Sequence, residues 1–360
     1  MNEVDTILRK QIDGGLSPSV HYIIFNENKV IHKFLGGFAH LKNQKKTSEN
    51  TAYHLFSITK TFTALAILQL AEQEKLHIDQ FVKEHLPEFP YGSEITIRQL
   101  MSHSAGIPNP IPLSWIHLPE EHQSFDSTTF FNHIYAKNSR VKARPNEKFG
   151  YSNLGYVLLG QLIEKVSGLP YEEYINIHIL KPSGIMETEM GFTIPHSEQC
   201  AKGYHKRFGF SNLILGFLMD KSKFMAKPEG KWVPFKENYV NGTAYGGLIG
   251  TPYSLVKYAQ ALLKPNSQLI SDDYKQMLFT ENFTNQNKAT GMCLSWFTGE
   301  LNGHRYVTHA GGGGGYYCEI RLYPEKGIGS VILFNRSGMR DERFLDKLDE
   351  HFLKNRNRAS

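Results

Sequence analysis

PNEKFGYSNLGYVLLG, residues 145–160, is the stretch on which the interpretation of this chain depends. It runs into a predicted helix over 152–166, whose first residue is a good N-cap and which Gly168 stops just beyond its end. Tyr151 and Asn153 flank that cap. A phenol held near a lysine can relay protons, and an amide two residues on can bind a substrate carbonyl and orient the lysine. The plainer alternative is an aromatic core residue followed by an N-cap.

Upstream, Ser57-Ile58-Thr59-Lys60 opens a second predicted helix over 59–75. Positions i and i+3 share a helix face, so the Lys60 amine can reach the Ser57 hydroxyl. A serine needs an adjacent base to attack a carbonyl, and a lysine freed of its proton can be that base. By itself this spacing is a weak signal, because it recurs by chance in many proteins.

Downstream, His309-Ala310-Gly311-Gly312 follows a predicted strand over 305–309. A glycine at that place lets another backbone approach closely, and the amide of Gly312 can join that of Ser57 as a pair of oxyanion donors. The alternative is a flexible glycine loop. A phosphate-binding loop does not fit, since no Gly-Lys-Ser/Thr follows.

Strand signals lie at both ends of the chain and helix signals lie between them. The sequence predicts a first helix around residues 4–12, a hairpin of strands 19–25 and 29–38, late strands 292–297, 305–309, 317–323 and 330–334, and a last helix over 341–353. Caps at Thr96 and Thr251 open two further helices. We therefore expect one antiparallel sheet, with the terminal helices packed on it and a mostly helical region beside it.

Composition excludes several classes of function. The formal net charge is +5 over 360 residues, which is too mild to indicate a nucleic-acid partner. Three distant cysteines imply neither a disulfide framework nor a zinc site. The sequence offers no signal peptide and no apolar stretch long enough to span a bilayer, so it predicts a cytoplasmic protein. A mature exported form with a replaced leader would look the same.

The order and wide spacing of the three motifs, with their flanking sequence, resemble the β-lactamase-like serine hydrolases, a group that includes penicillin-binding proteins, class C β-lactamases, DD-peptidases and esterases. Residues 100–107, LMSHSAGI, resemble the loop that precedes the second motif, and 246–251, GGLIGT, resemble the return segment before the late strands. The resemblance runs from about residue 15 to 337. His103, in the first of these segments, is expected to hydrogen-bond loops together.

The resemblance implies an α+β fold of the β-lactamase/DD-peptidase type, with the active site between the sheet and the helices. It divides the chain into a sheet region, 1–56 with 246–360, and a mostly helical region, 57–245, which together form one catalytic unit. No metal or cofactor is implied.

The resemblance also assigns roles. Ser57 is the nucleophile of an acyl-enzyme mechanism, and Lys60 and Tyr151 handle its proton. Asn153 positions the substrate. The remaining residues of the site, which belong to the third motif and the oxyanion hole, are His309, Gly311 and Gly312.

The third motif departs from the Lys-Thr/Ser-Gly of many β-lactamases, because His309 and Ala310 stand at its first two places. Without the hydroxyl donor, recognition of a free carboxylate should be poorer. We therefore favour an esterase, amidase or D-aminopeptidase-like hydrolase of a small-molecule or peptide substrate. A penicillin-binding DD-carboxypeptidase or weak β-lactamase, and a non-catalytic scaffold on the same fold, remain alternatives. The sequence does not predict an oligomeric state.

The segment 202–227 matches no motif of the group and looks like an insertion. Its apolar run, 208–219, is bounded by basic residues: the segment holds six Lys or Arg against the single acid Asp220. One interpretation is a helix or loop that packs on the domain. The other is a lid beside the active site that offers apolar surface to an acyl chain or to an anionic membrane surface.

Overall fold

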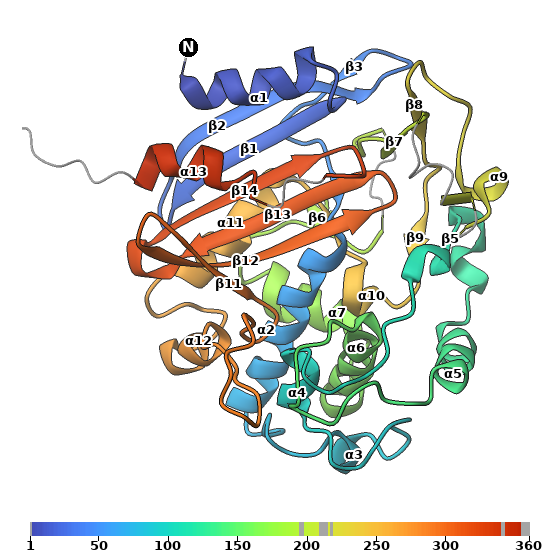
Figure 1. Cartoon of the computed structure of the whole chain (residues 1–360), viewed down its shortest axis with the longest axis vertical. Helices are drawn as coiled ribbons and strands as arrows, with labels where there is room; N and C mark the ends of the chain where they lie inside the picture. Colours follow the sequence, from blue (N-terminus) through green and yellow to red (C-terminus); the bar gives the residue numbers. More distant parts are fainter. Residues whose placement is uncertain (1, 194–197, 209–214, 217–218, 340–342, 354–360) are drawn as a thin grey trace, which may run out of the picture.

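A seven-stranded antiparallel sheet forms the upper half of the molecule (Figure 1). The computed structural model describes residues 2–193, 198–208, 215–216, 219–339 and 343–353. The sheet has the strand order β11-β12-β13-β14-β1-β2-β3. Its strands are β1 (Ser19–Asn26), β2 (Val30–His40), β3 (Lys45–Lys46), β11 (Phe297–Leu301), β12 (His304–Gly313), β13 (Tyr316–Tyr323) and β14 (Ile328–Phe334). The first hairpin thus joins the late strands through the β1–β14 pairing, which confirms the predicted sheet.

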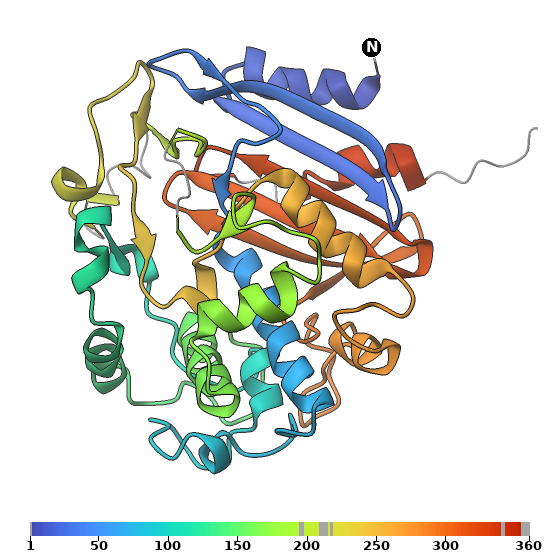
Figure 2. The same ribbon diagram turned by 180° about the vertical axis from the view of Figure 1, so that it is seen from behind.

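Helices cover both faces of this sheet. Helices α1 (Glu3–Asp13) and α13 (Asp346–Leu353) lie on the face turned to the viewer in Figure 1, and α11 (Pro252–Leu263) crosses the other face, as Figure 2 shows from behind. The other helices are α2 (Thr59–Glu72), α3 (Val82–His85), α4 (Ile97–Met101), α5 (Ser127–Lys137), α6 (Asn153–Ser167), α7 (Tyr171–Ile175), α9 (Lys221–Phe224), α10 (Thr243–Gly246) and α12 (Asp272–Leu278). The α+β fold is confirmed.

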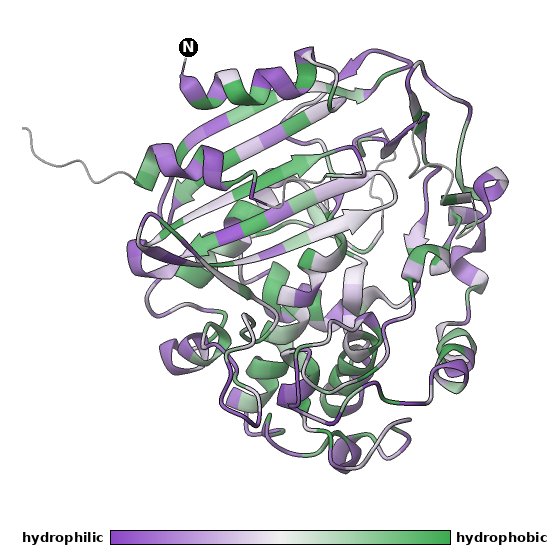
Figure 3. Ribbon diagram, in the orientation of Figure 1, coloured by the Kyte–Doolittle hydropathy of each residue, from purple (hydrophilic) through white to green (hydrophobic). Residues whose placement is uncertain are grey.

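Because both faces are covered, the central strands are apolar on both sides. In β1, Val20, Tyr22 and Ile24 pack with α1 and α13 in a small core, whereas Ile23 and Phe25 join the main core on the opposite face. Hydrophobic residues gather along the central strands and α2 in Figure 3, whereas α1 and α12 carry many hydrophilic residues at the outside.

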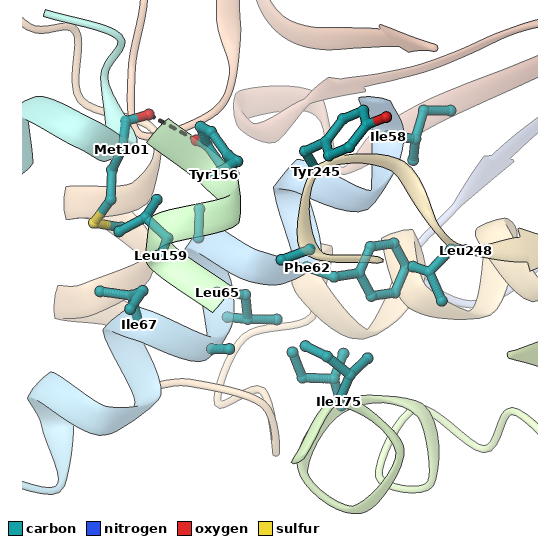
Figure 4. Packing of buried hydrophobic residues seen from close by; sticks show 14 of the residues in the cluster. Ile58, Phe62, Leu65, Ile67, Met101, Tyr156, Leu159, Ile175, Tyr245 and Leu248 are labelled. Carbon is teal, nitrogen blue, oxygen red and sulfur yellow. Dashed lines mark hydrogen bonds between the residues drawn. The ribbon is translucent and has the colours of Figure 1, made fainter. Parts of the chain in front are cut away.

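Helix α2 is the centre of the helical half. Every residue from Thr59 to Ala71 is buried, which is the pattern of a helix surrounded by protein on all sides. Figure 4 shows side chains of α2, among them Phe62 and Leu65, between Tyr156 of α6 and Leu248 of the return segment. The hydroxyl of Tyr156 donates to the Met101 carbonyl at 2.7 Å and so ties α6 to α4.

Short ribbons and 3-10 turns connect these layers. The ribbons are β4 (Tyr53–His54) with β10 (Ile249–Gly250) and β6 (Met190–Gly191), β5 (Ile116–His117) with β9 (Tyr239–Val240), and β7 (Tyr204–Lys206) with β8 (Trp232–Pro234). The 3-10 turns that matter below are η1 (Phe56–Ile58) and η2 (Pro112–Ser114). No helix in the part of the chain that the structure describes has the length and apolar composition needed to cross a membrane.

Most predicted helix boundaries are confirmed, because local caps set them. Ser152 caps α6, Gly168 ends it in a left-handed conformation with φ of 74°, and Thr251 caps α11. The predicted strand 292–297 is wrong: β11 begins only at Phe297. Ser295 has a φ of 72°, and its amide donates to the Met101 carbonyl at 3.0 Å, which breaks the extended backbone. The last helix begins at Asp346 instead of 341, and residues 341–342 lie outside the described chain. The division into regions at residues 57 and 245 stays a prediction.

A buried carboxylate fastens the last helix to the sheet. Asp349 of α13 accepts hydrogen bonds from Tyr22 at 2.8 Å, Ser330 at 2.8 Å and Tyr323 at 2.9 Å. Arg321 of β13, also buried, lies 3.9 Å from this carboxylate. Removing one member of such a network leaves buried polar groups without partners, which costs more than the network itself contributes.

We expect Asp349→Ala to lower the free energy of unfolding by about 3–5 kcal/mol, the usual cost of breaking a buried ionic network. Urea unfolding at neutral pH measures this change. The neighbouring Glu350→Ala, at a partly exposed position, serves as the control and should cost under about 1 kcal/mol. Equal effects of the two substitutions would contradict a structural role for the Asp349 network.

Candidate active site

Ser57 lies in the 3-10 turn η1, directly before α2. The turn is entered through Phe56, a non-glycine residue with a φ of 44°, so the backbone just before the serine is held in a sparsely populated conformation. Lys60 follows one helical turn later, and its Nζ donates to Ser57 Oγ at 3.0 Å. The predicted Ser–Lys contact is therefore present in the structure.

Lys60 is fully buried in a cage of tyrosines. Its Nζ donates to the Tyr245 carbonyl at 2.7 Å and lies 5.0 Å, 5.2 Å and 5.6 Å from the ring centres of Tyr151, Tyr245 and Tyr156. Burial lowers the pKa of Lys60 well below its ordinary value, because an ammonium loses its hydration there. The rings oppose part of this loss through cation–π attraction. The result is an amine that loses its proton more readily than an exposed lysine.

Tyr151 enters the site from the segment before α6. Burial raises the pKa of its phenol, and a hydrogen bond with the Ser57 side chain acts in the opposite direction. The His103 ring lies against the phenol, with ring centres 4.2 Å apart. His103 Nδ1 accepts from the Ser152 amide at 3.1 Å, so this histidine ties the loop 100–107 to the start of α6, as expected. It therefore carries a proton on Nε2 when neutral.

Asn153 is the first residue of α6 and is held by a partner that the sequence analysis missed. Its backbone amide and its side-chain amide both donate to Asn109 Oδ1, at 3.0 Å and 3.2 Å. From the sequence, we expect Asn153 to orient Lys60. In the structure, the partners of the Lys60 amine are instead Ser57 Oγ and the Tyr245 carbonyl. Asn109 and Tyr245 are therefore additional members of the site.

The third motif lies on β12, whose end packs against η1. Gly311 faces the backbone of Leu55 so closely that a Cβ at this position would lie 2.0 Å from the Leu55 carbonyl oxygen. Gly312 has more room, with the nearest atom 3.7 Å from an added Cβ, and it lines a cavity together with Ser57 and Asn153. The close approach at Gly311 therefore brings Gly312 beside the serine.

His309 is buried and neutral. Its Nδ1–H donates to the Ser295 carbonyl, which leaves Nε2 without a proton. Burial is the main cause that lowers its pKa to about 3, and the charge of Lys60 adds to the effect. At neutral pH the first position of the third motif thus carries no positive charge, unlike the lysine found there in many β-lactamases.

The return segment holds the start of α2 in place. The Leu55 amide donates to the Leu248 carbonyl at 2.9 Å, and the Leu248 amide donates to Thr59 Oγ1 at 3.1 Å. One turn further along α2, Thr63 Oγ1 donates to the Ala244 carbonyl at 2.7 Å. Residues 243–250 therefore support the serine motif mainly through their backbone groups, and few of their side chains bear reactive groups.

The apolar run 208–219 is described only in part, since 209–214 and 217–218 lie outside the described residues. Leu215 and Met219 are buried in a satellite cluster with residues of β8, and Met219 also lines the cavity beside Ser57. Leu215 and Met219 therefore pack on the domain, and Met219 also borders the site, whereas Phe208 is 75% exposed.

The chain belongs to the beta-lactamase family, whose model matches residues 4–353. It is 28% identical over 359 residues to the protein flp of Staphylococcus aureus strain MW2. The alignment covers 97% of this chain and 65% of flp. The chain thus spans slightly less than two thirds of that relative.

Solved structures agree with this assignment. The octameric penicillin-binding protein homologue from Pyrococcus abyssi superposes with a TM-score of 0.73 at 28% identity, covering 94% of this chain and 74% of that one. A class C beta-lactamase superposes with a TM-score of 0.74 at 20% identity, covering 99% of this chain and 96% of that one. The family resemblance drawn from the motifs is confirmed.

The two neighbouring glycines of β12 should respond differently to alanine. Gly311→Ala forces a Cβ into the Leu55 carbonyl and moves the strand away from Ser57. We expect it to cost about 1–3 kcal/mol of stability and about 10²-fold or more in kcat/KM. Gly312→Ala keeps the amide and has room, so it should remain within about tenfold of wild type. Ester hydrolysis and thermal unfolding of both variants test this. A Gly312→Ala defect as large as that of Gly311→Ala would contradict the packing argument.

Proposed function

We propose that this chain hydrolyses uncharged ester or amide substrates through an acyl-enzyme on Ser57. The observation that carries the proposal is the 3.0 Å contact between Ser57 Oγ and a buried, caged Lys60 amine. A neutral lysine at that distance can accept the hydroxyl proton as the oxygen attacks the substrate carbonyl carbon. A non-catalytic scaffold would not need to bury an amine against a serine, since burial costs stability.

The proton path uses Lys60 and Tyr151 together. In acylation, the Ser57 O–H bond breaks, an Oγ–C bond forms, and Lys60 receives the proton. The bond from the carbonyl carbon to the leaving oxygen or nitrogen then breaks, Tyr151 gives that atom a proton, and Lys60 returns its proton to Tyr151. In deacylation, water attacks the ester carbonyl, its proton travels back along the same groups, and Ser57 is released. Apart from the substrate and one water molecule, the balance uses only groups of this chain.

Charge that develops on the substrate oxygen needs donors. We propose the amides of Ser57 and Gly312, which line the same cavity, and we propose that Asn153 positions the substrate. Asn109 Oδ1 accepts a hydrogen bond from the Asn153 side-chain amide. This bond fixes the plane of the Asn153 amide and so the direction of Asn153 Oδ1.

The neutral state of His309 and the methyl group of Ala310 argue for uncharged substrates. A carboxylate at this place would find no lysine and no hydroxyl, and a buried carboxylate without partners is costly. This favours an esterase, amidase or D-aminopeptidase-like activity on a small molecule or peptide. The names of the relatives, which include penicillin-binding proteins, favour the second candidate, a DD-carboxypeptidase or weak β-lactamase. Membrane contact through 208–219 and the cellular compartment stay predictions.

Ser57→Ala should abolish hydrolysis of p-nitrophenyl acetate above background while leaving the circular dichroism spectrum and thermal unfolding unchanged. It removes the only proposed nucleophile, whose hydroxyl lies at the edge of a packed core. A fluorophosphonate probe should label wild type and not this variant. Labelling of Ser57→Ala at the wild-type rate would assign the nucleophile to another residue and refute the proposal.

Lys60→Ala and Tyr151→Phe should each lower kcat/KM by about 10²-fold or more, the usual size of lost acid–base help. Because both serve one proton path, the double variant should lose less than the product of the two. A protonated lysine is no base, so the wild-type rate should fall as the pH drops through the lowered pKa of Lys60. This acidic limb should be absent in Lys60→Ala. Fully multiplicative losses, or an unchanged limb, would contradict a shared path.

A further inference from the structure

We infer that the cavity beside Ser57 is an acyl-group subsite for compact, uncharged, apolar groups, and that Met219 limits the length of the group it accepts. The inference rests on the proposed function, since it assigns the acyl half of the same substrate. The cavity has a volume of about 100 Å³. Ser57, Asn153 and Gly312 form its reactive side, and an acyl group attached to Ser57 would extend from them into the remaining space.

The other walls of the cavity are mainly apolar. They are formed by Pro112 and Leu113 of η2, Ile116 of β5, Val240 of β9, Phe235 and Met219, together with Phe56, Tyr245, Gly313 and Gly314. None of the lining residues in the described ranges carries a charge. A charged acyl group would therefore lose its hydration without gaining a partner, whereas each buried methylene gains about 0.8 kcal/mol in transfer free energy.

Size limits the occupant further. An engineered apolar cavity of about 150 Å³ holds a benzene molecule, so a cavity of about 100 Å³ suits a somewhat smaller group. Acetyl, propionyl, butyryl and short branched groups fit, and longer chains must displace a wall or extend out of the cavity into solvent. The geometry therefore points to short-chain esters, or to amides with a small aliphatic side chain.

The walls are part of a packed cluster and are not free loop tips. Met219 and Phe235 pack with Leu215, Phe224 and Met225 in the satellite cluster, where each is at most 8% exposed. Packed side chains resist displacement, so the cavity should keep its shape when a ligand binds. Leu113 and Ile116 pack against the same cluster, which makes the wall continuous.

The chain offers a matched pair of methionines for the test. Met219 and Met225 are both 7% exposed and belong to the same cluster, but only Met219 lines the cavity. Met219→Ala and Met225→Ala therefore remove the same side chain from the same kind of packing. A change of acyl preference in the first variant alone separates a wall of the subsite from a general loosening of the cluster.

The experiment measures kcat/KM for p-nitrophenyl acetate, butyrate, hexanoate and octanoate. Wild type should prefer acetate and butyrate to octanoate. Met219→Ala should raise the hexanoate-to-butyrate ratio by about tenfold, the scale of one or two methylenes in an apolar pocket, and Met225→Ala should leave the ratio unchanged. If Met219→Ala does not fold, Ile116→Val, a milder widening of the same cavity, should shift the ratio in the same direction by a smaller factor.

A second matched pair tests charge. Leu113 and Leu118 are both half-buried beside the cluster, and only Leu113 lines the cavity. Leu113→Lys should raise activity on p-nitrophenyl hydrogen glutarate, measured above its spontaneous rate, relative to the pentanoate. Leu118→Lys should leave this ratio unchanged.

Two results would overturn the inference while the proposed function stands: Met219→Ala and Met225→Ala with the same chain-length profile, or wild type preferring octanoate or glutarate. In both cases the fluorophosphonate would still label Ser57. A wild-type protein that neither hydrolyses acetate nor reacts with the probe would instead refute the proposed function.

Discussion

The burial of one amine organises this structure. Lys60 is fully buried, and a charged ammonium there would lose several kcal/mol of hydration. The fold offsets part of this loss with hydrogen bonds to the Ser57 hydroxyl and the Tyr245 carbonyl and with contacts to three tyrosine rings. These groups come from η1, from α10 and from both sides of the α6 cap. The Lys60 amine has all of its partners only when each of these segments is in place. The chemistry of the site and the packing of the helical half therefore both require the same arrangement of these segments.

A second constraint joins the two halves of the molecule through backbone. Gly311 lets β12 approach Leu55 closer than any side chain would allow, and Leu55 also donates to Leu248. Phe56 follows with its strained φ, and its ring packs over Gly313 and Gly314. The serine is thus fixed between a sheet edge and a loop, and strain of this kind persists only where the surroundings over-determine it. The proposed oxyanion donors sit on different elements but have little freedom to separate.

The sequence predicted the features that neighbouring residues determine, such as helix ends. It did not predict the features that depend on backbone groups distant along the chain. Caps at Ser152 and Thr251 and the stop at Gly168 depend on a few neighbouring residues, so the helices were placed well. The predicted start of β11 was wrong because the Ser295 amide donates a hydrogen bond to the carbonyl of Met101, which is distant in the sequence. Tyr245 escaped notice since it holds Lys60 through a carbonyl, a group that every residue has. Asn109 acts across 44 positions in a segment without a recognisable motif.

The walls of the acyl cavity come from two cores. Val240 and Tyr245 belong to the main core, whose Tyr156 and Tyr245 rings also lie around Lys60, whereas Met219 and Phe235 belong to the satellite cluster. Ile116 packs against both clusters, so it is the point at which a change in one can reach the other. Substitutions deep in the satellite cluster can therefore reshape the acyl cavity while the environment of Lys60 stays intact. Such a division lets one reaction serve different acyl groups, because transition-state stabilisation and side-chain selection depend on partly separate packing.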